Sequence, residues 1–206
     1  EGEPAFDLRR ALIPEGEEEE AVSAEDSGAA ADGGELTTLR SMLCELSNPV
    51  AGGQIALLIL RFAAEVMNRG VIFRATGTEV LGFGQFGIEI PGANADQHVR
   101  RIQIPLRAPS VFHDVVAKRS IIRGPLEENA WNARMVDFLG GGRPEDAFVA
   151  PVIAGENVVA VLYGDNIPGK TPVRNTEALE IFLSQAGLAF EKAILEQRIM
   201  EMKTRG

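Results

Sequence analysis

The chain has 206 residues, of which 45% are hydrophobic and 24% charged, and a net charge of −10 at pH 7. This is the balance of a globular protein with enough apolar residues for one core. The acidic excess repels phosphates and no apolar run could span a bilayer, so we expect neither nucleic-acid binding nor a membrane span. The single cysteine, Cys44, excludes an internal disulfide and fits a reducing compartment, so we expect a cytoplasmic protein.

The first 34 residues have the composition of a linker. They contain the acidic run EGEEEE at 15–20, followed by Ala, Ser, Asp, Glu and Gly. Such a segment buries too little apolar surface to offset the entropy lost on ordering. We therefore expect a disordered acidic linker over residues 1–34 and one folded domain over residues 35–206. Because the chain opens on Glu1 and on no signal-peptide pattern, we also expect a further upstream domain of the same polypeptide.

The domain opens with helical patterns. Leu39, Met42, Leu43 and Leu46 have the spacing of one helix face, and a longer apolar helix is predicted over residues 54–68. Residues 70–76 and 80–90 then read as two strands. The second strand contains the run GFGQFG, and glycines inside a strand indicate a bulge or the close approach of a ligand or another backbone.

The middle of the chain mixes short elements. We predict a strand over residues 99–106, a helix from the N-cap Ser110 to about residue 118, a short strand over 120–124 and a helix over 127–139. Three glycines at 140–142 end that helix. With Arg143 and Pro144 they form either a helix stop or a flap over a pocket.

Residues 146–166, DAFVAPVIAGENVVAVLYGDN, give the strongest hairpin signal in the chain. Two β-branched runs flank the polar turn AGEN, and both are apolar on successive residues, which predicts a hairpin covered on both faces. A long helix follows from about residue 175 toward 203. Since strands and helices do not alternate regularly, the predicted fold class is α+β.

This order of elements resembles the GAF domain of the PAS/GAF superfamily. The resemblance rests on the helix at 55–68, the strands at 71–76 and 80–90, and the hairpin with Pro151, Gly155 and the polar end Gly164-Asp165-Asn166. It implies a central antiparallel sheet with long N- and C-terminal helices on one face and a helix-containing crossover on the other. It further implies a sensory module of a bacterial multidomain signalling regulator, similar to those joined to PATAN-type or receiver domains. The chain lacks an NKFDE-type signature for cyclic nucleotides, and Cys44 precedes the position expected for a bilin, so the cofactor stays unknown.

Candidate ligand-binding residues follow from this placement over the sheet and crossover. They are Phe83, Gln85, Phe112, Arg123, Trp131, Arg134, Asp165 and Asn166. Most of them have a structural alternative: Phe83 and Gln85 as part of a twisted or bulged strand, Phe112 and Trp131 as core, and Asp165 and Asn166 as turn residues. His98, His113 and Cys44 are not spaced as metal ligands, and Ser110 is better explained as a cap than as a nucleophile. We therefore expect no metal site and no catalysis.

The C-terminal helix carries a second pattern. Ile181, Leu188, Leu195 and Met202 recur every seventh residue, away from the stripe expected to face the core. With Leu57 and Leu60 of the 54–68 helix they form the predicted homodimer interface. Because Ser184, Glu191 and Arg198 at the other seam position are polar, the alternatives are a chance pattern or a contact with an absent neighbouring domain. We expect a non-catalytic regulatory module that binds a small molecule or protein and signals through dimerising helices. The alternatives are a structural dimerisation module whose pocket is filled by its own side chains, or an enzyme of the methionine-sulfoxide-reductase type, against which the single Cys44 argues.

Overall fold

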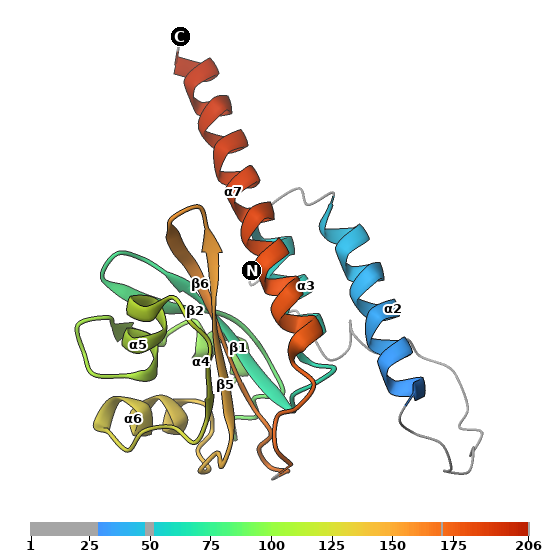
Figure 1. The fold of residues 1–206 in the computed structure, drawn as a ribbon. Coiled ribbons are helices and arrows are strands. Elements are labelled where there is room, and N and C mark those ends of the chain that lie inside the picture. The colour runs from blue at the N-terminus through green and yellow to red at the C-terminus, as the bar shows by residue number, and fades with distance from the viewer. Residues whose placement is uncertain (1–28, 48–51, 170, 206) are drawn as a thin grey trace.

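The computed structural model describes residues 29–47, 52–169 and 171–205 (Figure 1). Its elements are, in chain order, α2 (Ala29–Leu46), α3 (Gly52–Ala63), β1 (Arg69–Ala75), β2 (Glu79–Phe86), α4 (Ala95–Val99), β3 (Gln103–Pro105), α5 (Val111–Lys118), β4 (Ile122–Gly124), α6 (Ala130–Phe138), β5 (Ala147–Ala154), β6 (Asn157–Asp165) and α7 (Glu177–Arg205). The predicted linker mostly falls outside the described residues. Its last part, residues 29–34, starts α2 instead, and the alanines at 29–31 favour that helix.

The six strands form one sheet in the order β3-β2-β1-β6-β5-β4, and each neighbouring pair is antiparallel. The predicted hairpin is β5 and β6, closed by a turn in which Gly155 has a φ of +58°. Neither strand lies at an edge of the sheet, because β1 borders β6 and β4 borders β5. The sequence-based prediction of a central hairpin is therefore confirmed.

Two cores lie on opposite faces of this sheet. The helices α3 and α7 cover one face, with α2 packed on these two helices, and α4, α5 and α6 belong to the crossover on the other (Figure 1). Successive residues of β6 serve both cores: Leu162 packs on the helix side, while Val161 and Tyr163 pack on the crossover side. This explains why the hairpin is apolar on successive residues. The predicted α+β class and its two-sided arrangement are confirmed.

The glycines of β2 admit neighbouring parts of the same chain. A Cβ at Gly82 would lie 2.0 Å from the carbonyl oxygen of Val99, at the end of α4. The Gly82 N–H donates to the carbonyl of Ile102 at 2.9 Å. On the helix face, a Cβ at Gly84 would lie 3.1 Å from a methyl group of Leu60. The predicted close approach is therefore made by this chain's own backbone and side chains.

The strand predicted over residues 99–106 is largely wrong. Asn94 caps a short helix, α4, by accepting a hydrogen bond from the Gln97 N–H at 3.0 Å, and only Gln103–Pro105 form a strand. Val99 and Ile102 are both buried, and their three-residue spacing suits a turn of helix rather than an alternating strand.

Helix α3 also ends earlier than predicted, at Ala63. The backbone then tightens, because the N–H groups of Glu65 and Val66 donate to the carbonyls of Phe62 and Ala63. Of the helices that the structure describes, none combines the length and the apolar character needed to cross a membrane.

Candidate functional site

The space over the sheet, where a ligand was expected, is filled by side chains. Phe112 of α5 is fully buried and meets Phe73 edge to face, with ring centroids 4.6 Å apart. Met135 of α6 and Tyr163 of β6 are buried in the same core. Phe112 is therefore a core residue in this structure rather than the wall of an open site, which is the structural alternative considered for it above.

Gln85 is held by two internal hydrogen bonds. Its side-chain amide donates to Asp96 of α4 at 3.0 Å, and its side-chain oxygen accepts from the Ile88 N–H at 3.0 Å. Gln85 thus ties β2 to α4 and is buried, whereas Phe83, two residues earlier, is largely exposed. The two residues do not form a joint binding surface.

Asp165 lies at the centre of a buried charge cluster. Its carboxylate accepts from Arg69 Nε at 2.7 Å and from Nη2 at 3.0 Å, and from the Tyr163 hydroxyl at 2.6 Å. The other Arg69 nitrogen donates to the carbonyls of Leu139 and Gly141. Burial raises the pKa of the Tyr163 hydroxyl well above its ordinary value, and the negative charge of Asp165 raises it further. This cluster fastens the glycine-rich loop after α6 to the sheet.

Asn166 has a structural role of the same kind. Its side-chain oxygen accepts from the Asn68 N–H at 2.9 Å, and its side-chain amide donates to the Thr171 carbonyl at 2.8 Å. The hydrogen-bonding groups of Asp165 and Asn166 therefore serve the ends of β1 and β6.

Trp131 and Arg134 lie together on α6. The Arg134 guanidinium stacks 5.7 Å from the centroid of the Trp131 ring and 5.5 Å from that of Phe138. This cation–π arrangement is on one helix and leaves Arg134 exposed.

Arg123 connects the crossover to the C-terminal helix. It lies on β4 over the Phe148 ring, donates to the Thr176 hydroxyl at 3.1 Å and forms an ion pair with Glu180. Thr176 directly precedes α7 and is buried, and its own hydroxyl donates to Glu180 at 2.7 Å. Arg123 therefore holds the first turn of α7 against β4.

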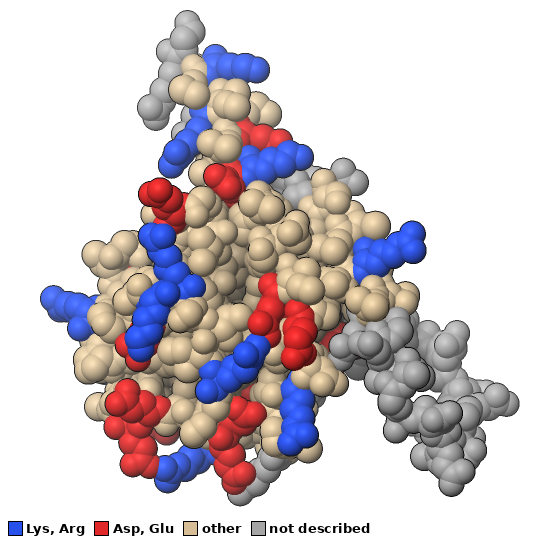
Figure 2. Space-filling model, in the orientation of Figure 1, with Lys and Arg blue, Asp and Glu red and all other residues tan. Residues whose placement is uncertain are grey.

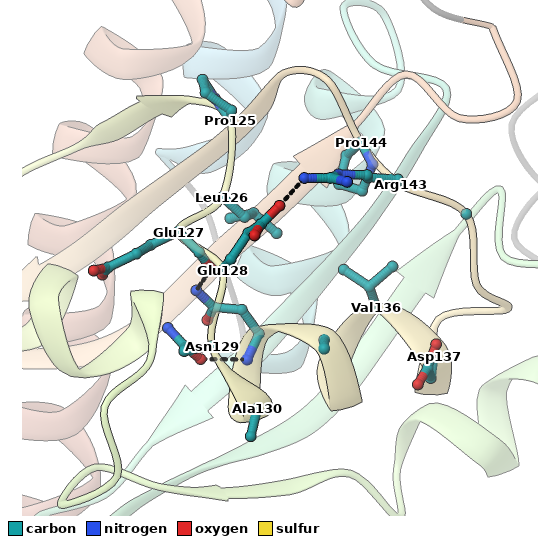
Figure 3. A pocket seen from close by; sticks show the side chains of 13 residues that line it. Pro125, Leu126, Glu127, Glu128, Asn129, Ala130, Val136, Asp137, Arg143 and Pro144 are labelled. Atoms are coloured by element: carbon teal, nitrogen blue, oxygen red, sulfur yellow. Dashed lines mark hydrogen bonds and ion pairs between the residues drawn. The ribbon is translucent and has the colours of Figure 1, made fainter.

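An open pocket lies at the outer side of α6 (Figure 3). It has a volume of about 550 Å³ and is bounded by the loop after β4, by one side of α6 and by the loop before β5. Leu126 and Val136 line it, and an ion pair between Glu128 and Arg143 spans its mouth. Of the residues predicted to bind a ligand, none lines this pocket. The run at 140–144, considered above as a flap, was the sequence signal that pointed to it.

A second cavity, of about 660 Å³, lies where β1 begins and β2 ends. Arg69 borders it, but its guanidinium is already held by Asp165 and by two carbonyls. Within residues 29–47, 52–169 and 171–205, His, Cys, Asp and Glu side chains form no group that could hold a metal ion. Ser110 caps α5 by accepting from the His113 N–H at 3.3 Å.

The residues predicted for a dimer interface divide into two groups. Four of them, on α7, are at least 50% exposed: Ile181, Leu188, Leu195 and Met202. Two further apolar residues of α7, Ile199 and Met200, are also exposed. On α3, Leu57 is 38% exposed, whereas Leu60 is only 2% exposed and packs under β2. Leu60 therefore cannot contribute to an interface, because its side chain is already part of the core.

The exposed residues of α7 continue beyond the body of the domain. The C-terminal part of α7 projects past the sheet, while its first part packs on β5, α2 and α3 (Figure 1). Among the described residues on the face in view, Lys and Arg side chains are interspersed with Asp and Glu (Figure 2). That face therefore shows no broad patch of one charge.

Comparisons with known proteins show the fold. No family model and no curated protein matches the sequence. Among solved structures, the chain is similar to residues 122 to 287 of a methyl-accepting chemotaxis protein, with a TM-score of 0.59 and 14% identity over 75% of this chain and 97% of that one. It is also similar to the GAF domain of an Acinetobacter phosphoenolpyruvate-protein phosphotransferase, with a TM-score of 0.57 and 20% identity over 80% and 95% of the two chains.

A third similar structure is the phycoerythrobilin-bound GAF domain of a cyanobacterial phytochrome, with a TM-score of 0.57 and 12% identity over 81% of this chain and 99% of that one. At these identities the similarity concerns the fold. Together with the sheet order and the two covered faces, it shows a GAF-like fold.

Proposed function

We propose that this chain, which has the fold of GAF domains, is a non-catalytic regulatory module of a cytoplasmic bacterial signalling protein. It binds a small molecule in the crossover and transmits binding to a homodimer formed by its long helices. Similar structures come from a chemotaxis protein and from a phosphotransferase, both of which support a role in signalling. A non-catalytic role agrees with the use of Ser110 as a helix cap and of Asp165 in an ion pair.

The exposed seam of α7 is the observation that carries this proposal. Leu188, Leu195 and Met202 follow one another at seven-residue intervals, and Ile199 adds a position four residues after Leu195. Spacings of four and three residues are those of a coiled-coil seam. Lys192 and Gln185 occupy the corresponding earlier positions, so the apolar seam is strongest in the part of α7 that projects from the domain. A second copy of the same helix would bury it.

Arg123 supplies a route from the crossover to this seam. Pro125 and Leu126, which line the pocket, are separated from Arg123 only by Gly124, the last residue of β4. Because Arg123 is bonded to Thr176 and Glu180, movement of the pocket wall would alter how the first turn of α7 is held. Such a change shifts the equilibrium between two packings of α7 only if the ligand binds the two with different affinities.

A second candidate is a structural dimerisation module without a ligand. The packed core around Phe112 and Met135 favours it, because the space over the sheet is already filled. Both candidates require a dimer. Sedimentation equilibrium of the chain at tens of micromolar tests this shared requirement: a dimer supports the proposal and a monomer contradicts it.

A further inference from the structure

The pocket beside α6 has an apolar floor with room for a ring. Ala130 and Ala133 of α6 both line it, and their side chains are too small to fill it. Val136 and the buried Pro144 complete the apolar lining. Its volume of about 550 Å³ lies within the range of small-molecule sites.

Three of the four side-chain polar groups of Asn129 and Asn132 are already hydrogen-bonded within the chain. The Asn132 oxygen accepts from the Val111 N–H at 2.9 Å, and its amide donates to the Glu127 carbonyl at 2.9 Å. The Asn129 oxygen accepts from the N–H groups of Trp131 and Asn132 at the start of α6. A ligand group that reaches this floor gains no partner from these atoms, so the inner part of the ligand should be apolar.

The mouth of the pocket carries the charge. Glu128 and Arg143 meet across it from two facing loops, and Glu127 and Asp137 lie on its flanks (Figure 3). The lining therefore has three carboxylates and one guanidinium, and its potential favours a cation. The side chains of Arg143 and Glu128 are 83% and 79% exposed, so their ion pair is easily exchanged for another.

We propose that this pocket binds a primary amine with an apolar body about the size of one ring. The ammonium group takes the place of Arg143 beside the Glu128 carboxylate, and the apolar body lies against Leu126, Ala133 and Val136. Arg143 then turns to solvent from the end of the glycine run at 140–142, whose positive φ angles only glycine adopts readily. This inference rests on the proposed function and names the chemical class of its ligand.

Three probes of one shape test the chemistry: benzylamine, benzyl alcohol and benzoate. Titration of the full chain, followed by amide NMR, should show benzylamine binding about tenfold more tightly than benzyl alcohol, with benzoate weakest. The shifted amides should belong to residues 126–137 and to Gly142 and Arg143, because Pro125 and Pro144 have no N–H. Equal affinity for the three probes, tighter binding of benzoate, no binding, or shifts elsewhere in the domain would overturn the inference.

Exposed positions of the pocket supply matched variants. Glu128→Gln should weaken benzylamine several-fold and leave benzyl alcohol unchanged, whereas Arg143→Gln should strengthen benzylamine by removing its competitor. Ala133→Phe should fill the pocket and abolish binding of both. Amide spectra without ligand show whether each variant is folded. If the chain is a dimer but binds no benzylamine, only the proposed ligand class is refuted. If the chain is a monomer that binds benzylamine, the proposed homodimer is refuted and the assignment of the pocket stands.

Discussion

The guanidinium of Arg69 and the carboxylate of Asp165 form a two-pronged ion pair inside the protein, with nitrogen–oxygen distances of 2.7 and 3.0 Å. The two residues are paired across β1 and β6, and their side chains are 4% and 0% exposed. Arg69 also holds the carbonyls of Leu139 and Gly141. The Arg69–Asp165 pair thus joins the sheet to the loop after α6, which continues to the pocket at residues 142–144.

Asp165→Ala should lower the free energy of unfolding by about 3–5 kcal/mol, because it leaves the Arg69 charge buried without its partner. Urea denaturation measures this loss. The exposed pair at the pocket mouth provides the control: Glu128→Gln should cost at most about 1 kcal/mol. Equal costs for the two variants would show that burial of the Arg69–Asp165 pair does not determine its contribution.

Tyr163 should make stability depend on alkaline pH. Its pKa in the folded state is raised above the ordinary value of 10.0, so the folded state keeps a proton that the unfolded state loses. The contribution of Tyr163 to the free energy of unfolding is therefore fully present below pH 10. It is lost as the pH rises from 10 toward the pKa of the folded state. Tyr163 is the single tyrosine, so tyrosinate absorbance reports this group alone. In the folded protein, we expect the tyrosinate absorbance to appear only at pH values well above 10.

Tyr163→Phe is the control for that pH dependence. It removes the titrating hydroxyl, so the free energy of unfolding should fall less steeply above pH 10 than in the wild-type chain. A tyrosinate signal near pH 10 in the folded wild-type protein would contradict the buried position of the hydroxyl beside Asp165.

Truncation of Leu57 and of Leu60 in α3 should lower stability to very different degrees. Leu60→Ala removes a buried side chain and should cost about 2–5 kcal/mol of unfolding free energy. Leu57→Ala, at a partly exposed position, should cost much less in stability. Thermal and urea unfolding of the two variants measure the contrast. A larger loss from Leu57→Ala would mean that the rotation of α3 on the sheet differs from the one described.

The fold was predictable where local signals were strong. Residues 146–166 show a β-branched pattern on both sides of a turn, and Ser110 stands directly before an apolar helical face, so β5, β6 and α5 were placed correctly. The α4 helix was missed because Ile102 and Ile104 alternate with Arg101 and Gln103 as in a strand, and that strand was extended back to Val99 without regard to the cap at Asn94.

The candidate site was less predictable because it depends on contacts between distant residues. Asp165 and Arg69 are 96 positions apart, and nothing local to Asp165 shows that its carboxylate is already paired. Gln85 likewise reads as a free amide until α4 brings Asp96 to it. The pocket is formed where the loop after β4 meets the loop before β5, and an arrangement of two loops leaves no periodic pattern in the sequence.

Arg123→Gln should loosen the start of α7 without unfolding the domain. The Arg123 side chain is about half exposed, so loss of its ion pair should cost at most about 1 kcal/mol of unfolding free energy. The amides of the first turn of α7, near Thr176 and Glu180, should exchange with deuterium faster. Arg134→Gln, another exposed arginine over an aromatic ring, should leave that exchange unchanged. Unchanged exchange in Arg123→Gln would remove the proposed route from the crossover to α7.

Association through α7 is the central claim, and two matched double variants isolate its seam. Leu188→Glu with Leu195→Glu places charges on the exposed seam. Gln197→Glu with Thr204→Glu adds the same charge on the opposite side of the helix. Circular dichroism and thermal unfolding show whether both remain folded, as expected because neither pair is buried.

Sedimentation equilibrium of the three proteins at tens of micromolar is the decisive measurement. We predict twice the 22.1 kDa chain mass for the wild-type chain and for Gln197→Glu/Thr204→Glu, and a folded monomer for Leu188→Glu/Leu195→Glu. A wild-type monomer, or a dimer that survives the seam substitutions, would contradict the proposal that this module signals through α7.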